Sequence, residues 1–297
     1  MVTHSNADQT DQVLPRVGVK RRDQVAMTLQ VLFLVLVSVI LFGPLILLAL
    51  FSFNDSPALN MPITGFTTQW YTDAIENERL REAIWNSVKI SIIVMPTCLV
   101  LGTAAAFGLS RFEFRGRGIV GGFIALPLVI PWLLTGVGAL LFFNALDISL
   151  SLLTVGIMHT VVAFPLVAAL VAAQLYRIDR ALEEASHDLG ATHRQTLRLV
   201  ILPLLIPTLA ASAVFVFIWS FNNFIISFFT IGFDNTFPIW VFSSLRRSGN
   251  VPVINAISTL VSVVQIALVW TAWRYLRFRS AQRGQDVREV IAGGTTA

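Results

Sequence analysis

Residues 24–54 read QVAMTLQVLFLVLVSVILFGPLILLALFSFN and contain no Asp, Glu, Lys or Arg. A helix needs roughly 20 such residues to cross about 30 Å of hydrocarbon. Five further intervals are free of charge, at residues 90–110, 118–146, 148–176, 199–233 and 248–273. The strand-length alternation typical of a membrane barrel is absent from the sequence. The sequence therefore predicts an all-α polytopic membrane protein with six transmembrane helices.

The composition of the whole chain agrees with a membrane location. Of its 297 residues, 55% are hydrophobic and 13% are charged, whereas a typical soluble domain has about 25% charged residues. This excludes a single soluble domain, and it also excludes a disordered chain, which needs low hydrophobicity. One cysteine, Cys98, allows no internal disulfide and no thiolate metal site. The net charge of +4 is distributed as expected for a membrane protein rather than a nucleic-acid binder.

Lys and Arg gather in alternate loops, which predicts the orientation of the chain, because cytoplasmic loops retain positive charge. Sixteen of them lie in the terminal segments and in the loops after the second and fourth intervals. The opposite loops contain four, which are Arg79, Arg81, Arg246 and Arg247. Both termini are therefore expected to be cytoplasmic. We expect a largely disordered tail over 1–24, a transmembrane domain over 25–278 and a second tail over 279–297.

The sequence lacks the residues that an ATP-hydrolysing or metal-dependent enzyme requires. A phosphate-binding loop needs Gly-Lys followed by Ser or Thr, but the two lysines of this chain follow Val19 and Val88. The histidines have no carboxylate or cysteine companions at ligand spacing. Ser110 and His159 are the candidates for a serine-protease pair, but their positions predict different depths in the membrane. We expect His159 to hydrogen-bond a neighbouring helix instead.

The loop between the fourth and fifth intervals, residues 177–198, carries the most specific pattern. Asp179 is suited to cap a short helix. The apolar residues of this helix share one face, and they are Leu182, Ala185 and Leu189. Gly190 suits the left-handed residue that ends such a helix. Thr192 and Gln195 match a capping box that opens the next helix.

Two helices that meet at a glycine are expected to project from the membrane. The same caps are also compatible with an ordinary solvated loop, and on these features alone the two interpretations have equal weight.

The same residues resemble the EAA motif of binding-protein-dependent ABC transporter permeases. The matching positions are Glu184, Ala185, Ser186, Gly190, Val200, Leu202 and Pro203, with Ser in place of the second Ala and Val in place of the usual Ile. In that family the loop is a coupling helix that docks on a separate ATPase. The resemblance implies an ATPase contact through Leu182, Glu183, Glu184, Ala185, Ser186, Asp188, Leu189, Gly190 and Ala191.

Other segments resemble the spermidine/putrescine branch of this family. They are Phe51 to Asn54, Trp70 with Tyr71, Asn86 with Ser87, Phe112 to Gly116, Leu126 to Pro131, and Ile254 to Ala256 with Thr259 and Leu260. The branch implies a polyamine-like or other small organic solute. Where polyamine permeases tend to have two aspartates, this chain has Asn222 and Asn223. Amides can hydrogen-bond a solute but cannot neutralise a polycation.

The resemblance also implies partners and a location. We expect an ATPase dimer that binds ATP and Mg²⁺, a second permease of different sequence and an extracytoplasmic solute-binding protein. The chain itself is expected to bind no cofactor and no nucleic acid. Its expected location is the cytoplasmic (inner) membrane of a bacterium or archaeon.

A polar cluster in the fifth interval is the candidate lining of the translocation path. It consists of Ser220, Asn222, Asn223 and Ser227. Hydrogen bonding between helices, including those of a partner permease, is the alternative role for these residues. Residues 237–245 are too short to span the bilayer and are expected to form an outer helix or re-entrant turn.

Two other classes of function are weaker alternatives. A secondary transporter that works without an ATPase normally needs ionisable groups in mid-membrane, and this sequence offers only His159 there. A membrane enzyme would need a nucleophile and a base at one depth, which the spacing of Ser110 and His159 does not provide.

Overall fold

The computed structural model describes residues 21–56, 63, 65–246 and 251–293. Contacts divide the chain into two compact units, Met1–Leu50 and Phe51–Ala297. The described residues are helical or irregular, apart from one isolated β-bridge between Asn54 and Phe66. Most of the expected tail over 1–24 lies outside the described residues.

The first unit contains α1 (Arg21–Phe51), which extends to the boundary with the second. Its segment Ala26–Phe51 has a mean hydropathy of 3.1 and is long enough to span a bilayer. The helix begins at Arg21, within the expected tail, and Pro44 lies inside it. The first charge-free interval therefore forms one membrane-spanning helix, as predicted.

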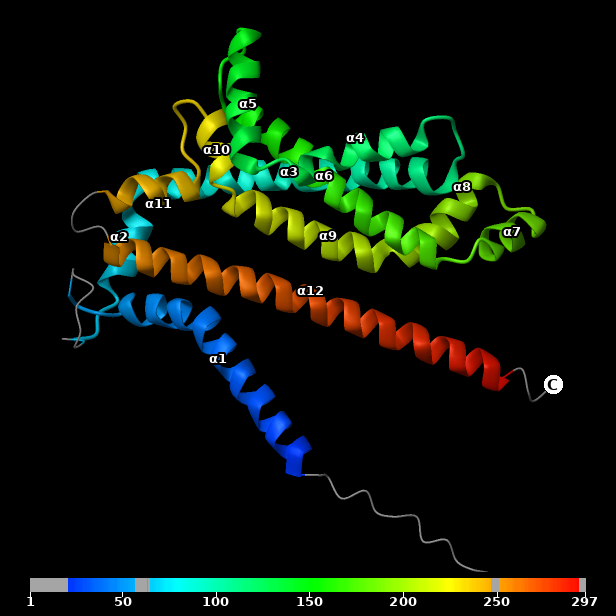
Figure 1. Cartoon of the computed structure of the whole chain (residues 1–297), viewed down its shortest axis with the longest axis horizontal. Helices are drawn as coiled ribbons and strands as arrows, with labels where there is room; N and C mark the ends of the chain where they lie inside the picture. Colours follow the sequence, from blue (N-terminus) through cyan, green and yellow to red (C-terminus); the bar gives the residue numbers. More distant parts are fainter. Residues whose placement is uncertain (1–20, 57–62, 64, 247–250, 294–297) are drawn as a thin grey trace, which may run out of the picture. The chain divides into compact units, whose positions relative to one another are not determined.

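The second unit is built around three long helices that lie side by side (Figure 1). They are α3 (Glu78–Arg111), α6 (Leu152–Arg177) and α9 (Leu202–Asn222). Helix α12 (Val251–Gly293) packs against α9. The buried core between the helices is aliphatic, with Val94, Cys98, Val167, Val171, Leu175, Leu205 and Val216. The last turns of α12 occupy most of the expected tail over 279–297.

Helices α3 and α6 pack closely at Gly102. A Cβ atom built on Gly102 would lie 2.7 Å from Cβ of Val167 and 3.0 Å from the backbone nitrogen of Ala168. Small residues allow helix backbones in membranes to pack at such short range. Gly102 thus permits the central contact of the unit.

The third expected span, residues 118–146, is not one straight helix. It is divided into α4 (Arg117–Val129) and α5 (Trp132–Ala145), and the chain bends by 103° between them. Ile130 is extended at the break, with φ −71° and ψ 129°, because the ring of Pro131 disfavours the helical conformation in the residue before it. Among the described residues, five helices are long and apolar enough to span a membrane, and the bent pair makes a sixth candidate.

The fifth expected span, residues 199–233, is also interrupted. It begins in a π-helical turn, η1 (Leu197–Ile201), continues as α9, and ends at Asn222 before the short helix α10 (Ile225–Thr230). The π turn precedes Pro203, which has no N–H to donate and whose ring clashes with the carbonyl four residues earlier. Helix α10 packs on α5 and α6 rather than extending α9.

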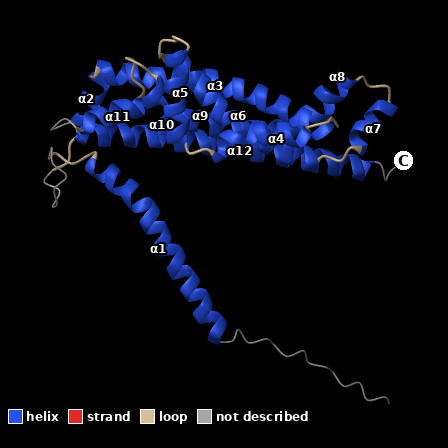
Figure 2. Cartoon of the chain, turned by 45° about the horizontal axis from the view of Figure 1, so that its top comes forward, coloured by secondary structure: helices blue, strands red, loops and turns tan. Residues whose placement is uncertain are grey.

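Two short helices cover one end of the second unit (Figure 2). Helix α2 (Gln69–Glu76) packs on α12, and α11 (Phe237–Leu245) packs on α3. Ser87 Oγ accepts a hydrogen bond of 2.9 Å from the N–H of Phe237. A short helix over residues 237–245 is therefore present, as expected.

Candidate functional site

The predicted helix pair in the loop 177–198 is present, as α7 (Ala181–Asp188) and α8 (His193–Thr196). Both helices lie at one end of the second unit, beside the end of α6 (Figure 1). Arg180 occupies the cap position of α7, and Asp179 Oδ1 accepts a hydrogen bond of 3.0 Å from the N–H of Ala181. Asp179 therefore satisfies a free N–H at the helix start, as expected from the sequence.

Gly190 ends α7 in the left-handed conformation, with φ +82°. Its N–H donates to the His187 carbonyl at 2.8 Å, and the N–H of Ala191 donates to the Ser186 carbonyl at 3.0 Å. These two bonds form a Schellman motif. The capping box between Thr192 and Gln195 then starts α8. The helix caps of the loop were therefore predictable from its residues.

The apolar face of α7 contacts no other part of the described chain closely enough to bury it. Leu182, Ala185 and Leu189 are exposed, and Leu189 is 89% accessible. Glu184 and Asp188 are also exposed. These apolar side chains are therefore open to solvent in the described chain.

Two other residues of α7 face the rest of the unit. Ser186 Oγ lies 2.7 Å from Oγ1 of buried Thr196. Glu183 Oε1 lies 2.6 Å from Nη2 of Arg111 at the end of α3. The sequence did not reveal Arg111 as a partner of this loop, because more than seventy positions separate the two charges along the chain.

The polar cluster expected along the path is divided between two environments. Ser220 and Ser227 are buried and lie 2.9 Å and 3.1 Å from the two ring nitrogens of His159. His159 therefore joins α6 to α9 and α10, which confirms its expected hydrogen-bonding role. Ser110 instead donates to the carbonyl of Ala106, so no Ser110–His159 pair forms.

Asn222 and Asn223 border a cavity. Asn222 is exposed and donates to the Ile218 carbonyl at 2.9 Å and to Gln265 Oε1 at 3.1 Å. Asn223 is 6% exposed, and its Oδ1 accepts from the N–H of Ile226 at 3.1 Å. Asn223 thus caps α10 as well as facing the cavity.

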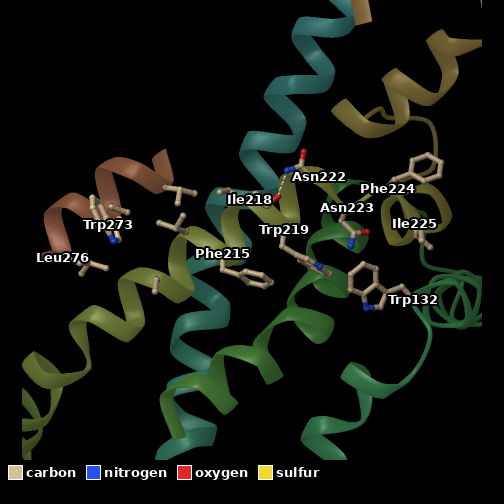
Figure 3. Close-up of a pocket in the computed structure, with 14 residues that line it drawn as sticks. Trp132, Phe215, Ile218, Trp219, Asn222, Asn223, Phe224, Ile225, Trp273 and Leu276 are labelled. Atoms are coloured by element: carbon tan, nitrogen blue, oxygen red, sulfur yellow. Dashed lines mark hydrogen bonds between the residues drawn. The ribbon is translucent and has the colours of Figure 1, made fainter. Parts of the chain in front are cut away.

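The cavity has a volume of about 790 Å³ and lies along α9 and α12 (Figure 3). Apart from Asn222 and Asn223, the described residues that line the cavity are apolar. Five of them are aromatic: Trp132, Phe215, Trp219, Phe224 and Trp273. The rings of Trp132 and Trp219 meet edge to face with centroids 5.8 Å apart. An uncharged wall of this kind can contact a solute through ring faces and amide groups.

Comparisons with known proteins agree with this architecture. Residues 98–280 match the family model described as binding-protein-dependent transport system inner membrane component. The chain is 31% identical to the putrescine transport system permease protein PotI of Escherichia coli strain K12, over 85% of this chain and 92% of the relative. It is 29% identical to the spermidine/putrescine permease protein PotC of Shigella flexneri, over 84% and 94% of the two chains.

Solved structures share the fold at lower identity. A bacterial ABC transporter that imports the acidic polysaccharide alginate aligns with a TM-score of 0.67 and 18% identity, covering 86% of this chain and 97% of the other. The MetNI methionine ABC transporter aligns with a TM-score of 0.57 and 21% identity, covering 67% and 95%. With a family model that matches most of its length, this chain belongs to the inner membrane components of binding-protein-dependent transport systems.

Proposed function

We propose that this permease subunit passes a small organic cation of the polyamine type across a bacterial inner membrane, after an external binding protein delivers it. The chain is a transmembrane subunit of an ATP-driven importer, as its family members are, and not a secondary transporter. The coupling site, the solute and the individual partners are the proposed parts.

The exposed apolar face of α7 carries the coupling part of the proposal. Leu182 on this eight-residue helix is 47% exposed, and Leu189 at its C-terminal cap is 89% exposed. Amphipathic helices of this kind bind by laying an apolar face into a groove of a partner. The partner is an ATPase dimer that binds ATP and Mg²⁺, and its docking on α7 implies that α7 and both chain termini are cytoplasmic.

The cavity along α9 and α12 is the proposed part of the solute path. Aromatic faces attract organic cations at short range, and amide oxygens accept hydrogen bonds from ammonium groups. Asn222 and Asn223 would contact the solute, while Ser220 and Ser227 hold the backbone around them through His159. A second, different permease chain would close the open side of the cavity. The relatives named for putrescine and spermidine support a cationic solute.

Uptake by the assembled transporter tests the coupling and the solute together. The permease, its ATPase, the second permease and the binding protein are reconstituted in vesicles, and uptake of labelled putrescine is measured with and without ATP. We expect ATP-dependent uptake that Leu189→Asp lowers by about tenfold or more, because a charge on a desolvated docking face costs several kcal/mol.

Leu189→Met is the matched control, because it keeps an apolar side chain at the same position, and it is expected to retain uptake. ATPase that still co-purifies in normal amounts with the Leu189→Asp variant would contradict docking on α7. Normal vesicle uptake of a neutral or anionic solute, with none of putrescine, would contradict the proposed solute class.

A further inference from the structure

Two contacts join helix α7 to the C-terminal end of α3. Nη2 of Arg111 lies 2.6 Å from Oε1 of Glu183, with the two side chains 11% and 26% exposed. The contacting atoms themselves are shielded from solvent, and they form an ion pair without the alignment of a hydrogen bond. One residue earlier on α3, the carbonyl of Ser110 accepts a hydrogen bond of 3.2 Å from Nη2 of Arg180, at the start of α7. Consecutive residues of α3 thus contact the first turns of α7.

The ion pair is placed where both charges are favourable. Arg111 lies in the last turn of α3, and Glu183 lies in the first turn of α7. A positive charge at a helix C-terminus and a negative charge at a helix N-terminus each complement the helix dipole. Because solvent does not screen the contacting atoms, removing one charge leaves the other without compensation.

Apart from these two contacts with α3, α7 is connected to the unit through the segments that flank it. Before α7 the backbone is extended at Ile178, with φ −82° and ψ 117°, and after α7 it turns at Gly190. The remaining packing of α7 is with α8 and η1, which continue into α9. Since α3 packs on both α6 and α9, the ion pair closes a ring that runs from α7 to α3, α9, η1 and back to α7.

Other charges in the same region do not take part in this connection. Glu113 and Arg115 follow α3 directly, are exposed, and form no ion pair within the described part of the chain. Their presence shows that a basic loop at this end of the molecule does not by itself produce the contact. The Arg111–Glu183 pair is therefore a specific feature of the tertiary structure.

We propose that Arg111 is a positioning residue that holds α7 against α3. A displacement of α7 then moves α3, α6 and α9 together. This inference rests on the proposed docking of an ATPase on α7. It adds that the energy of ATP hydrolysis reaches the solute path through α3 as well as along the chain into α9.

The test compares ATP hydrolysis with solute uptake in one preparation of the complete transporter in vesicles. Arg111→Gln and Glu183→Gln are each expected to lower the number of solute molecules taken up per ATP by about tenfold, with the ATPase still bound, because each breaks a shielded pair. Glu183→Gln preserves the shape of the side chain, so it provides the test even if Arg111→Gln fails to reach the membrane.

The exchanged double variant Arg111→Glu with Glu183→Arg distinguishes loss of the ion pair from a general loss of folding or assembly. It should recover the uptake ratio to within about threefold of the original, short of full recovery because both exchanged charges oppose their helix dipoles. Glu113→Gln and Arg115→Gln are the matched controls and should leave the ratio unchanged.

Three results would overturn the inference. The single variants could keep the original uptake ratio, or the double variant could be as defective as the single ones. Loss of the ATPase from the Arg111→Gln complex would assign the residue to docking instead of transmission. In each of these cases the unmodified complex still shows ATP-dependent uptake, so the proposed function stands; an unmodified complex without ATP-dependent uptake would overturn both.

Discussion

Both ring nitrogens of His159 have a hydroxyl partner, and the hydrogen-bond directions follow from the chemistry of Ser227. Its hydroxyl donates to the carbonyl of Asn223 at 2.7 Å, so its oxygen can accept from Nε2–H of His159. In the tautomer with the proton on Nε2, Nδ1 is the acceptor for the hydroxyl of Ser220. A histidine with both ring nitrogens hydrogen-bonded thus holds the backbone beside the cavity where α9 ends.

Two serines of α9 differ in whether their hydroxyl group has a hydrogen-bond partner, and this difference allows a matched prediction. Ser220→Ala removes the partner of a buried ring nitrogen and should cost about 1–3 kcal/mol of stability. Ser212 is equally buried, but its hydroxyl has no partner among the described residues, so Ser212→Ala should be neutral or stabilising. Thermal unfolding of the purified chain in detergent measures both, and equal losses would contradict the hydrogen-bond assignment.

At the scale of the elements, close packing and helix breaks shape the second unit. Helices α3 and α6 pack at backbone distance because Gly102 has no side chain. Pro131 separates α4 from α5, and α9 begins after a π turn next to Pro203. Hydrophobicity predicted where the chain crosses the membrane, but it could not distinguish a straight span from a bent pair, because both contain the same apolar residues.

Two glycines of α3 test the packing of α3 on α6. Gly102→Ala would bring a methyl group against Val167 and the backbone of Ala168, which should cost about 1–3 kcal/mol of stability. Gly108 lies in the same helix with no atom within 4 Å of a built Cβ, so Gly108→Ala should stabilise by about 0.5–1 kcal/mol. Unfolding temperatures in detergent report both changes, and a stable Gly102→Ala variant would contradict the close contact.

At the scale of the molecule, the arginine-rich ends of α3 and α6 lie with α7 and α8 at one end of the second unit (Figure 1). The loop between α10 and α11 lies at the other end (Figure 1). The excess of positive charge predicts that the first of these ends is cytoplasmic. Under the proposed function, this charge distribution predicts that the ATPase and the binding protein act on opposite ends of the permease.

Labelling of introduced cysteines in intact cells checks this orientation. Cys98 is buried, and Cys98→Ala removes it as a background. Cysteine at exposed Asp234 should react with a membrane-impermeant maleimide from outside the cell, whereas cysteine at exposed Arg115 should react only after the membrane is permeabilised. The reverse pattern would place α7 outside the cell and exclude its contact with a cytoplasmic ATPase.

The sequence by itself determined the membrane character, the positions of the apolar helices and the turn at Gly190, because hydrophobicity, capping and glycine geometry act over short stretches of chain. Only the tertiary structure decided that Arg111 meets Glu183, that His159 joins Ser220 to Ser227, and that Asn222 borders an aromatic cavity. These contacts unite residues that are far apart along the chain. Their formation depends on how whole helices pack, which no local pattern of residues specifies.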